Sequence, residues 1–344
     1  GHVQHQDGML RCAPLSSRLI SRAARAPAFR SIPASSRALT VGTTPTDFQG
    51  RPRRSVLYMP GSNAKAVAKA RTIPADSICI DLEDAVAPAA KKEARMQVLA
   101  AIQEGGFGAR EIAVRANGLD TPWGADDIAM IAQSGAHAVC LPKVDSMETV
   151  IAVHQVMAKA GAPASMALWC MIETPLGVLR AEEICRAGRD SRNGRLTALV
   201  MGTSDLTKEL RAQHTPDRHA MHTSLQMVLL AARAHGVLAL DGVHLNFKDA
   251  AEFAAHCRQA KEMGYDGKTL IHPTQVAVAN EIFAPTPDQV AESEEIIAAH
   301  TAAVAEGENV VVVRGKLVEN LHVEEALRVL SMHAAIKELA AGSA

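Results

Sequence analysis

The chain reads Leu168-Trp169-Cys170-Met171-Ile172-Glu173 and, further on, Ala198-Leu199-Val200-Met201-Gly202-Thr203-Ser204-Asp205. Each stretch is a short, β-prone apolar run that leads to an isolated carboxylate, and such a run is typical of a buried strand. In folds with parallel strands, ligands bind just past the carboxyl ends of those strands. We therefore expect Glu173 and Asp205 to lie at a binding site.

Similar short runs alternate with helix-like stretches along most of the chain. The sequence predicts eight strands, at 55–59, 77–81, 112–115, 138–141, 168–173, 198–202, 237–241 and 268–271. Helical patterns fill the gaps, for example at 90–103, 147–160, 180–187, 221–235 and 249–263. This alternation, with no G-x-G-x-x-G after the first strand, favours an α/β fold of the (β/α)8 TIM-barrel type over an open doubly wound sheet.

Charged residues gather where the predicted strands end, and in a barrel those ends converge on one mouth. Arg115 ends the third run. It is always charged and makes bidentate contacts, which suits a substrate carboxylate or a carbonyl that becomes an oxyanion. The alternative is a structural ion pair with a carboxylate at the end of the second strand, namely Asp81, Glu83 or Asp84. The two roles are compatible, because a carboxylate could orient the arginine while it holds substrate.

Glu173 and Asp205 predict a Mg²⁺ site, because oxygen ligands on separate elements leave room for water and a chelating substrate. Asp205 has an alternative role with Ser204 as a helix cap, whereas glutamate is a poor cap. His219 and His222 are spaced i, i+3 on a predicted helix, but no supporting ligand stands near them in the sequence. We therefore interpret these two histidines as part of a solvated helix face.

The composition limits the class of protein. Of the 344 residues, 48% are hydrophobic and 21% are charged, which is enough for a sizeable core. The net charge of −1 argues against nucleic-acid or membrane-surface binding. No apolar run approaches the roughly 18 residues of a membrane span. Six cysteines without a C-x-x-C pair indicate a reducing compartment.

Residues 1–50 differ from the rest of the chain. Between residues 9 and 46 there are six arginines and no acidic residue. An arginine-rich, serine-rich and acid-free leader is typical of a mitochondrial transit peptide. We expect a disordered leader and import into the mitochondrial matrix; the alternative is a tail without a targeting role on a bacterial cytoplasmic enzyme.

The catalytic barrel is expected to occupy residues 51–285, and residues 286–344 to form a C-terminal appendage. The appendage has helix patterns at 288–305 and 323–339 and a β-like patch at 310–318. It is too short to bury a core alone, so it should pack on the barrel or on a neighbouring subunit.

Several motifs, in this order along the chain, resemble the citrate lyase β-subunit family of the HpcH/HpaI aldolase superfamily. They are Arg54-Ser55-Val56-Leu57-Tyr58-Met59-Pro60-Gly61, Asp81-Leu82-Glu83-Asp84-Ala85-Val86, Val114-Arg115-Ala116-Asn117-Gly118, Leu141-Pro142-Lys143-Val144, Ile172-Glu173-Thr174, Gly202-Thr203-Ser204-Asp205-Leu206 and Gly267-Lys268-Thr269-Leu270-Ile271-His272-Pro273-Thr274-Gln275. The family includes malyl-CoA and citramalyl-CoA lyases. The resemblance implies a (β/α)8 barrel, Mg²⁺, and retro-Claisen cleavage of a β-hydroxyacyl-CoA into a 2-oxo acid and an acyl-CoA.

The resemblance also implies roles for single residues. Glu173 and Asp205 would hold the metal, and Arg115 would grip the oxygen of the 2-oxo acid. The substrate carboxylate would be held by the amides of Gly202, Thr203, Ser204 and Asp205.

Two implied roles lie further from the strand ends. Lys65 and Lys69 would contact the phosphates of CoA. Lyases of this family often carry a Met-Ile-Asp motif in the appendage, which reaches a neighbour's active site. Here the corresponding residues are Gly315-Lys316-Leu317-Val318-Glu319-Asn320. The resemblance thus implies a homotrimer or hexamer in which Glu319 supplies the acid for the departing enolate.

Other reactions remain open for the same chain. One is a malyl-CoA thioesterase on the same barrel, and another is an aldolase that acts on free acids. A third is a citrate lyase β-type subunit that works within a complex.

Overall fold

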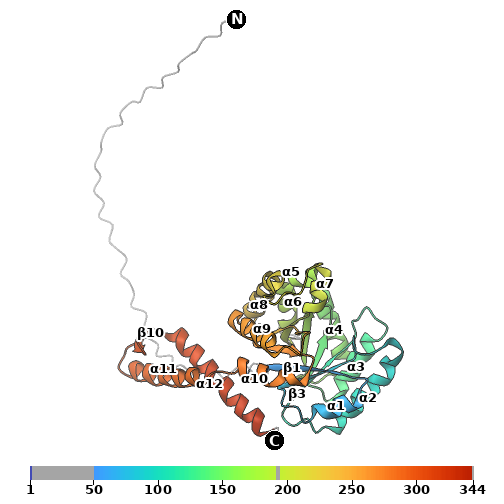
Figure 1. The fold of residues 1–344 in the computed structure, drawn as a ribbon, viewed down its shortest axis with the longest axis horizontal. Coiled ribbons are helices and arrows are strands. Elements are labelled where there is room, and N and C mark those ends of the chain that lie inside the picture. The colour runs from blue at the N-terminus through green and yellow to red at the C-terminus, as the bar shows by residue number, and fades with distance from the viewer. Residues whose placement is uncertain (2–49, 191–193, 343–344) are drawn as a thin grey trace, which may run out of the picture. The chain divides into compact units, whose positions relative to one another are not determined.

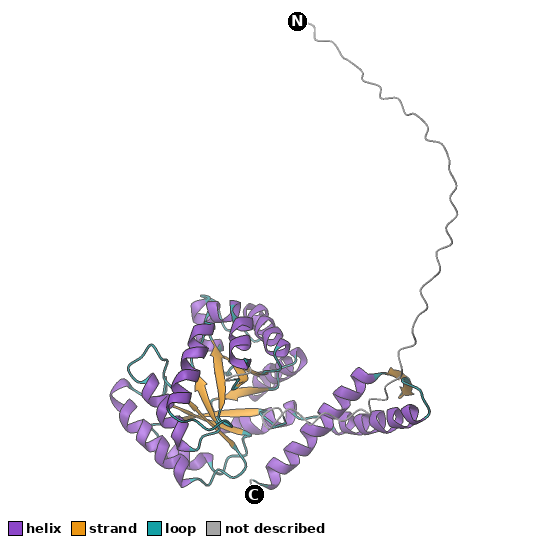
Figure 2. Ribbon diagram, turned by 180° about the vertical axis from the view of Figure 1, so that it is seen from behind, coloured by secondary structure: helices purple, strands orange, loops and turns teal. Residues whose placement is uncertain are grey.

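The computed structural model describes residue 1 and residues 50–190 and 194–342. The predicted leader therefore lies outside the described residues except at its two ends. Eight parallel strands close into a barrel, each paired with its neighbour in sequence order and the first with the last (Figure 2). The predicted (β/α)8 barrel is confirmed.

The predicted strands agree with the observed ones to within one or two residues at either end. The strands are β1 Ser55–Pro60, β2 Ser77–Asp81, β3 Glu111–Arg115, β4 Ala138–Leu141, β5 Ala167–Ile172, β6 Leu196–Met201, β7 Leu238–Asp241 and β8 Gly267–Leu270. Almost all of their residues are buried, as expected for strands covered on both faces.

Helices surround the barrel (Figure 1). They are α1 Ala64–Ala70, α2 Lys91–Glu104, α3 Gly124–Ser134, α4 Met147–Lys159, α5 Pro175–Leu179, α6 Ala181–Arg189, α7 Thr203–Glu209, α8 His222–Ala234, α9 Ala250–Met263 and α10 Val276–Phe283. Three short 3₁₀ turns precede α2, α8 and α10, at Pro88–Ala90, His219–Met221 and Pro273–Gln275. Within the described ranges, no helix is long and apolar enough to cross a membrane.

Side-chain alternation along each strand decides which residues enter the barrel. The apolar side chains inside it, which include Cys79, Ala113, Trp169 and Met171, form a cluster separate from the larger one beneath the helices. Because alternate residues of a strand share a face, Asp81 lies on the same face as Cys79. By the same rule, Arg115 lies on the face of Ala113 and Glu173 on the face of Met171, so both charged side chains point toward the barrel axis.

The C-terminal appendage consists of α11 Pro287–Ala305, β9 Val311–Val313, β10 Lys316–Val318 and α12 Asn320–Ala341. The strands form an antiparallel hairpin, turned by Arg314 and Gly315 with positive φ angles of 48° and 76°. Helices α11 and α12 pack against each other (Figures 1 and 2). The last helix begins three residues before its predicted start, because Glu319 and His322 form a capping box at its N-terminus.

Candidate active site

A cavity of about 460 Å³ opens at the carboxyl ends of the strands. It is lined by Tyr58, Pro60, Asp81, Asp84, Ala85, Arg115, Met171, Glu173, Met201, Gly202, Thr203, Ser204, Asp205, Val243, Leu245, Thr269 and Ile271. We call it the mouth cavity. The structure thus brings together the predicted metal ligands, the predicted arginine and the four residues after β6.

Glu173 follows β5 and is 1% exposed. Its Oε1 accepts a hydrogen bond of 2.7 Å from the backbone N–H of Lys143. Gly202 lies directly against this side chain, because a Cβ added at Gly202 would lie 2.2 Å from Glu173 Oε2. A side chain at position 202 would therefore displace the carboxylate. Burial, followed by the negative charges of Glu83 and Asp205, raises the pKa of Glu173 to about 7.

Asp205 is half-buried in the first turn of α7. The N-cap of this helix is Gly202, which offers no side-chain acceptor, so Ser204 and Asp205 do not cap the helix as the alternative interpretation had it. Two carboxylates close enough to influence each other's ionisation, on separate elements and beside a cavity, fit a hard divalent cation such as Mg²⁺.

Arg115 is held in place by carboxylates. Its Nε and Nη2 each donate to an oxygen of Asp81 at 2.7 Å, and its Nη1 lies 2.7 Å from Glu83 Oε2. Asp84 is more distant, at 3.6 Å. The guanidinium also lies over the Tyr58 ring, 5.1 Å from its centre. The predicted ion pair exists, and it leaves Arg115 in the lining of the mouth cavity, so the ion pair is compatible with the predicted substrate-binding role, which stays a prediction.

The sequence interpretation missed two lysines, of which Lys143 binds two of these carboxylates and Lys91 binds the backbone beside them. Lys143, whose φ is 53°, donates its backbone N–H to Glu173 and its Nζ to Glu83 at 2.7 Å. Lys91 is buried and donates to the carbonyls of Leu82 and Glu83. The signals for Lys143 were its place two residues after the fourth predicted strand and its presence in the motif Leu141-Pro142-Lys143-Val144, to which no role was assigned. Lys91 gave no signal, since it lies within a helix pattern.

Three residues that were predicted to take part in the site lie away from the mouth cavity of their own chain. Lys65 and Lys69 are exposed on α1, and neither is among the described residues that line the mouth cavity. Glu319 is exposed at the start of α12, beside a hairpin that packs on α11 and α12. A part for Glu319 in this site would therefore need a second subunit. The exposed His219 bonds to Asp217, in keeping with its interpretation as a surface residue.

Comparisons with known proteins agree with this architecture. Residues 54–273 match the model of the HpcH/HpaI aldolase/citrate lyase family. A (3S)-malyl-CoA thioesterase from Cereibacter sphaeroides is 44% identical over 288 residues, which cover 84% of this chain and 97% of that protein. The citrate lyase subunit beta of Escherichia coli is 35% identical over 286 residues, covering 82% of this chain and 93% of the relative.

Solved structures give the same result. The protein CitE from Mycobacterium tuberculosis, in complex with magnesium, acetoacetate and coenzyme A, has a TM-score of 0.65 and 26% identity. That likeness covers 83% of this chain and 99% of CitE. A citrate lyase beta subunit from the same organism, complexed with oxaloacetate and magnesium, has a TM-score of 0.58 and 28% identity, and it covers 69% of this chain and 99% of that one. The fold, the family match and the similarity over most of its length show that this chain belongs to the HpcH/HpaI aldolase/citrate lyase family.

Proposed function

We propose that the protein is a Mg²⁺-dependent enzyme that acts on the CoA ester of a short β-hydroxy acid, such as malyl-CoA or citramalyl-CoA. The reaction we assign is retro-Claisen cleavage to a 2-oxo acid and an acyl-CoA. The observation that carries the proposal is the meeting of Glu173, Asp205 and Arg115 in one cavity at the barrel mouth. The relatives named (3S)-malyl-CoA thioesterase support a CoA-ester substrate, and the solved structure with magnesium and coenzyme A supports the same substrate class and Mg²⁺.

Glu173 and Asp205 are the residues that would hold Mg²⁺. The elevated pKa of Glu173 supports this assignment, because a buried carboxylate that ionises reluctantly gains most from a bound cation. When bound, the cation would polarise the hydroxyl and carboxylate oxygens of the substrate's hydroxy-acid end and lower the pKa of the hydroxyl.

Arg115 would stabilise the negative charge that appears on the substrate hydroxyl oxygen when its proton leaves to solvent, before the carbon–carbon bond breaks and this oxygen becomes the ketone of the 2-oxo acid, since a preorganised cation favours developing negative charge. Asp81 fixes the guanidinium in two hydrogen bonds, so little reorganisation is needed during the reaction. Within the described part of the chain, no side chain caps the backbone N–H groups at the start of α7, which leaves them available to the substrate carboxylate.

The departing enolate needs a proton at carbon, and Glu319 of a neighbouring subunit is our candidate acid. We infer a homotrimer or hexamer in which the appendage of one chain completes the site of the next. The exposed position of Glu319 supports this arrangement, because within its own chain it does not line the mouth cavity described above.

A specific observation favours a second reaction, hydrolysis of the same thioester. The relatives named (3S)-malyl-CoA thioesterase are 43–44% identical to this chain, whereas the citrate lyase beta subunits are 33–35% identical. Hydrolysis would use the same carboxylates and arginine to bind the hydroxy acid, with attack directed at the thioester carbonyl.

Product analysis separates the two reactions. The purified chain is incubated with Mg²⁺ and malyl-CoA, citramalyl-CoA or 3-hydroxy-3-methylglutaryl-CoA, with Glu173→Gln as the matched control. Cleavage releases an acyl-CoA together with an oxo acid, which is a 2-oxo acid from malyl-CoA or citramalyl-CoA and the 3-oxo acid acetoacetate from 3-hydroxy-3-methylglutaryl-CoA. Hydrolysis releases free CoA and a hydroxy acid without any oxo acid. Absence of both product sets would overturn the proposal. Activity gained only with an acyl-carrier partner would point to a citrate lyase β-type subunit.

A further inference from the structure

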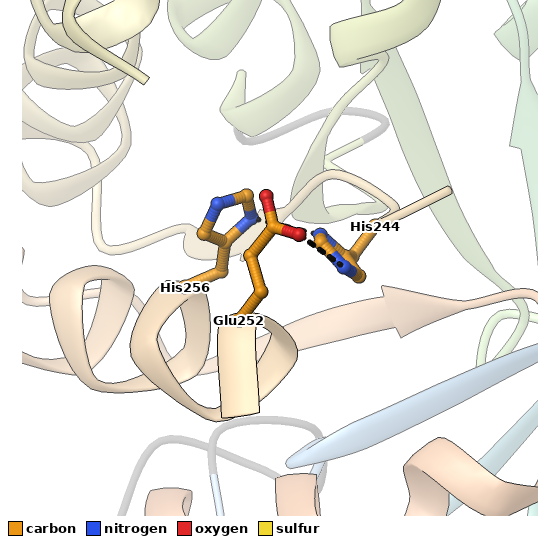
Figure 3. Close-up of side chains that lie close together, drawn as sticks. All are labelled: His244, Glu252 and His256. Atoms are coloured by element: carbon orange, nitrogen blue, oxygen red, sulfur yellow. Dashed lines mark hydrogen bonds and ion pairs between the residues drawn. The ribbon is translucent and has the colours of Figure 1, made fainter. Parts of the chain in front are cut away.

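A second group of ligand-type side chains lies beside the barrel mouth. His244 stands in the segment between β7 and α9, and Glu252 and His256 are spaced i, i+4 on α9. Figure 3 shows the three side chains pointing toward one another. One potential ligand atom of each lies within 4.8 Å of those of the other two. The histidines are only 5% and 7% exposed. We call these three residues the His-Glu-His cluster.

The hydrogen bonds determine which ring nitrogens carry protons. His256 Nε2 lies 2.9 Å from the carbonyl oxygen of Pro216, so this nitrogen carries a hydrogen and donates it. His256 Nδ1 is therefore an acceptor when the ring is neutral. It lies 3.1 Å from His244 Nδ1, so His244 donates from Nδ1. Burial lowers the pKa of both rings, that of His256 to about 4, which favours neutral imidazoles at pH 7.

This proton arrangement leaves His244 Nε2 with a lone pair. That nitrogen is buried, has no hydrogen-bond partner among the residues that the structure describes, and lies 3.9 Å from Glu252 Oε2. A lone pair and a carboxylate oxygen that face each other at this distance repel, and a buried polar atom without a partner carries a desolvation cost. A cation bound within the cluster would remove both penalties.

We propose that the His-Glu-His cluster binds Zn²⁺ or a similar borderline transition-metal ion. Two imidazoles and one carboxylate suit Zn²⁺ better than Mg²⁺, which prefers oxygen ligands only. The His256–Pro216 hydrogen bond orients the ring as second-shell contacts do in metal sites. Binding through His256 Nδ1 and His244 Nε2 breaks the hydrogen bond between the rings, and His244 keeps its proton on Nδ1.

The surroundings leave room for a further ligand. A cavity of about 150 Å³ borders all three residues, so water or a small ligand can complete the coordination. Two cations lie nearby, Arg218 and Lys268, but both are bound to Asp241. Their positive charge is thereby partly neutralised, and Glu252 adds the negative charge that a divalent ion needs.

The site has a structural consequence for the mouth. Val243 and Leu245, which flank His244 in the sequence, line both this cavity and the mouth cavity. An ion that ties His244 to α9 would fix the segment that forms this wall of the mouth cavity. Zinc would therefore raise the thermal stability of the chain, independently of any reaction at the mouth.

Metal titration of the full chain without a polyhistidine tag tests the proposal. Metal-stripped protein is titrated with Zn²⁺ by calorimetry in excess Mg²⁺, so that the mouth carboxylates are occupied. We expect one Zn²⁺ per chain, and binding weaker by at least about tenfold in His244→Asn and Glu252→Gln. Co²⁺ used as a probe should give the visible absorption of a nitrogen-ligated site in the wild type and lose it in both variants.

Two control variants locate the ion. His219→Asn removes an exposed histidine and should leave Zn²⁺ binding unchanged, as should Glu173→Gln at the mouth. Zinc uptake that is absent from the wild type, unchanged in both cluster variants, or lost in Glu173→Gln would overturn the proposal. Because the readout is metal binding and not turnover, its failure is distinct from failure of the proposed reaction.

Discussion

Asp81 and Arg115 are register partners on β2 and β3, and their side chains form a bidentate ion pair with two hydrogen bonds of 2.7 Å. The sheet itself therefore sets the position of the guanidinium, because both residues sit at the same level of adjacent strands. Nη1 of Arg115 points to the Glu83 carboxylate, so the arginine is held from two sides at the cavity wall.

Removing the charge of Asp81 should impair turnover more than folding. Asp81→Asn leaves one acceptor and one amide donor where the guanidinium needs two acceptors, so the arginine loses its fixed orientation. We expect kcat to fall by about a hundredfold, with a smaller change in KM. Asp84→Asn is the matched control, since Asp84 is exposed and 3.6 Å from Arg115. Equal kcat values in the two variants would contradict a positioning role for Asp81.

Gly202→Ala should weaken Mg²⁺ binding through a steric effect on Glu173. The new methyl carbon would lie 2.2 Å from Glu173 Oε2 and 2.3 Å from its Cβ, so the carboxylate must move. We expect the affinity for Mg²⁺, measured by calorimetry, to fall by at least about tenfold, a loss typical when metal ligands are displaced. The φ of Gly202 is −94°, which alanine adopts readily, so circular dichroism should show an intact fold. Unchanged Mg²⁺ affinity would mean that Glu173 is not a ligand.

The affinity for Mg²⁺ should depend on pH through Glu173. Its pKa is raised from 4.5 to about 7, so below pH 7 the proton competes with the metal. Affinity should fall about tenfold per pH unit below 7 and level off above it. Calorimetry in two buffers of different ionisation enthalpy should detect release of about one proton at pH 6 and almost none at pH 8. A pH-independent affinity between 5.5 and 8 would rule out this pKa.

The same shift affects stability without metal. Because the folded-state pKa of Glu173 lies above its unfolded value, the stabilisation is complete below pH 4.5 and is lost as the pH rises through 7. Saturating Mg²⁺ should suppress that loss, which chemical denaturation at pH 5 and pH 8 would reveal.

Subunit mixing tests the role of Glu319. Glu319→Gln and Glu173→Gln chains should each be inactive alone, because each lacks one part of every site. If the appendage of one subunit completes its neighbour's site, mixed oligomers contain some intact sites, and activity should return to a measurable fraction of the wild type. No recovery after verified subunit exchange, or a fully active monomer, would exclude catalysis across the interface.

Much of the fold could be predicted because the signals were local. The eight buried runs have strand length and end in polar residues, and side-chain period alone sends Asp81 and Arg115 to the same face of the sheet. Helix ends were less predictable. The start of α12 depends on a reciprocal cap between Glu319 and His322, which the apolar pattern did not show.

The supporting residues of the site could not be predicted in the same way. Lys143 reaches Glu83 from a strand end far along the chain, and such contacts exist only after the barrel closes. Two of the three residues of the His-Glu-His cluster could be grouped from the sequence, since Glu252 and His256 have the i, i+4 spacing of one helix face. His244 joins them only through the segment after β7, and the sequence interpretation considered the more obvious pair at His219 instead.

The metal assignment is tested by titrating Mg²⁺ into the wild type, Glu173→Gln and Asp205→Asn and measuring turnover of malyl-CoA on the same samples. We expect each variant to stay folded, to bind Mg²⁺ far more weakly, and to lose at least about a hundredfold in turnover, since loss of a contact to developing charge commonly costs about 3 kcal/mol or more. Near-normal Mg²⁺ binding and turnover in either variant would contradict the assignment of Glu173 and Asp205 as the ligands of the catalytic metal.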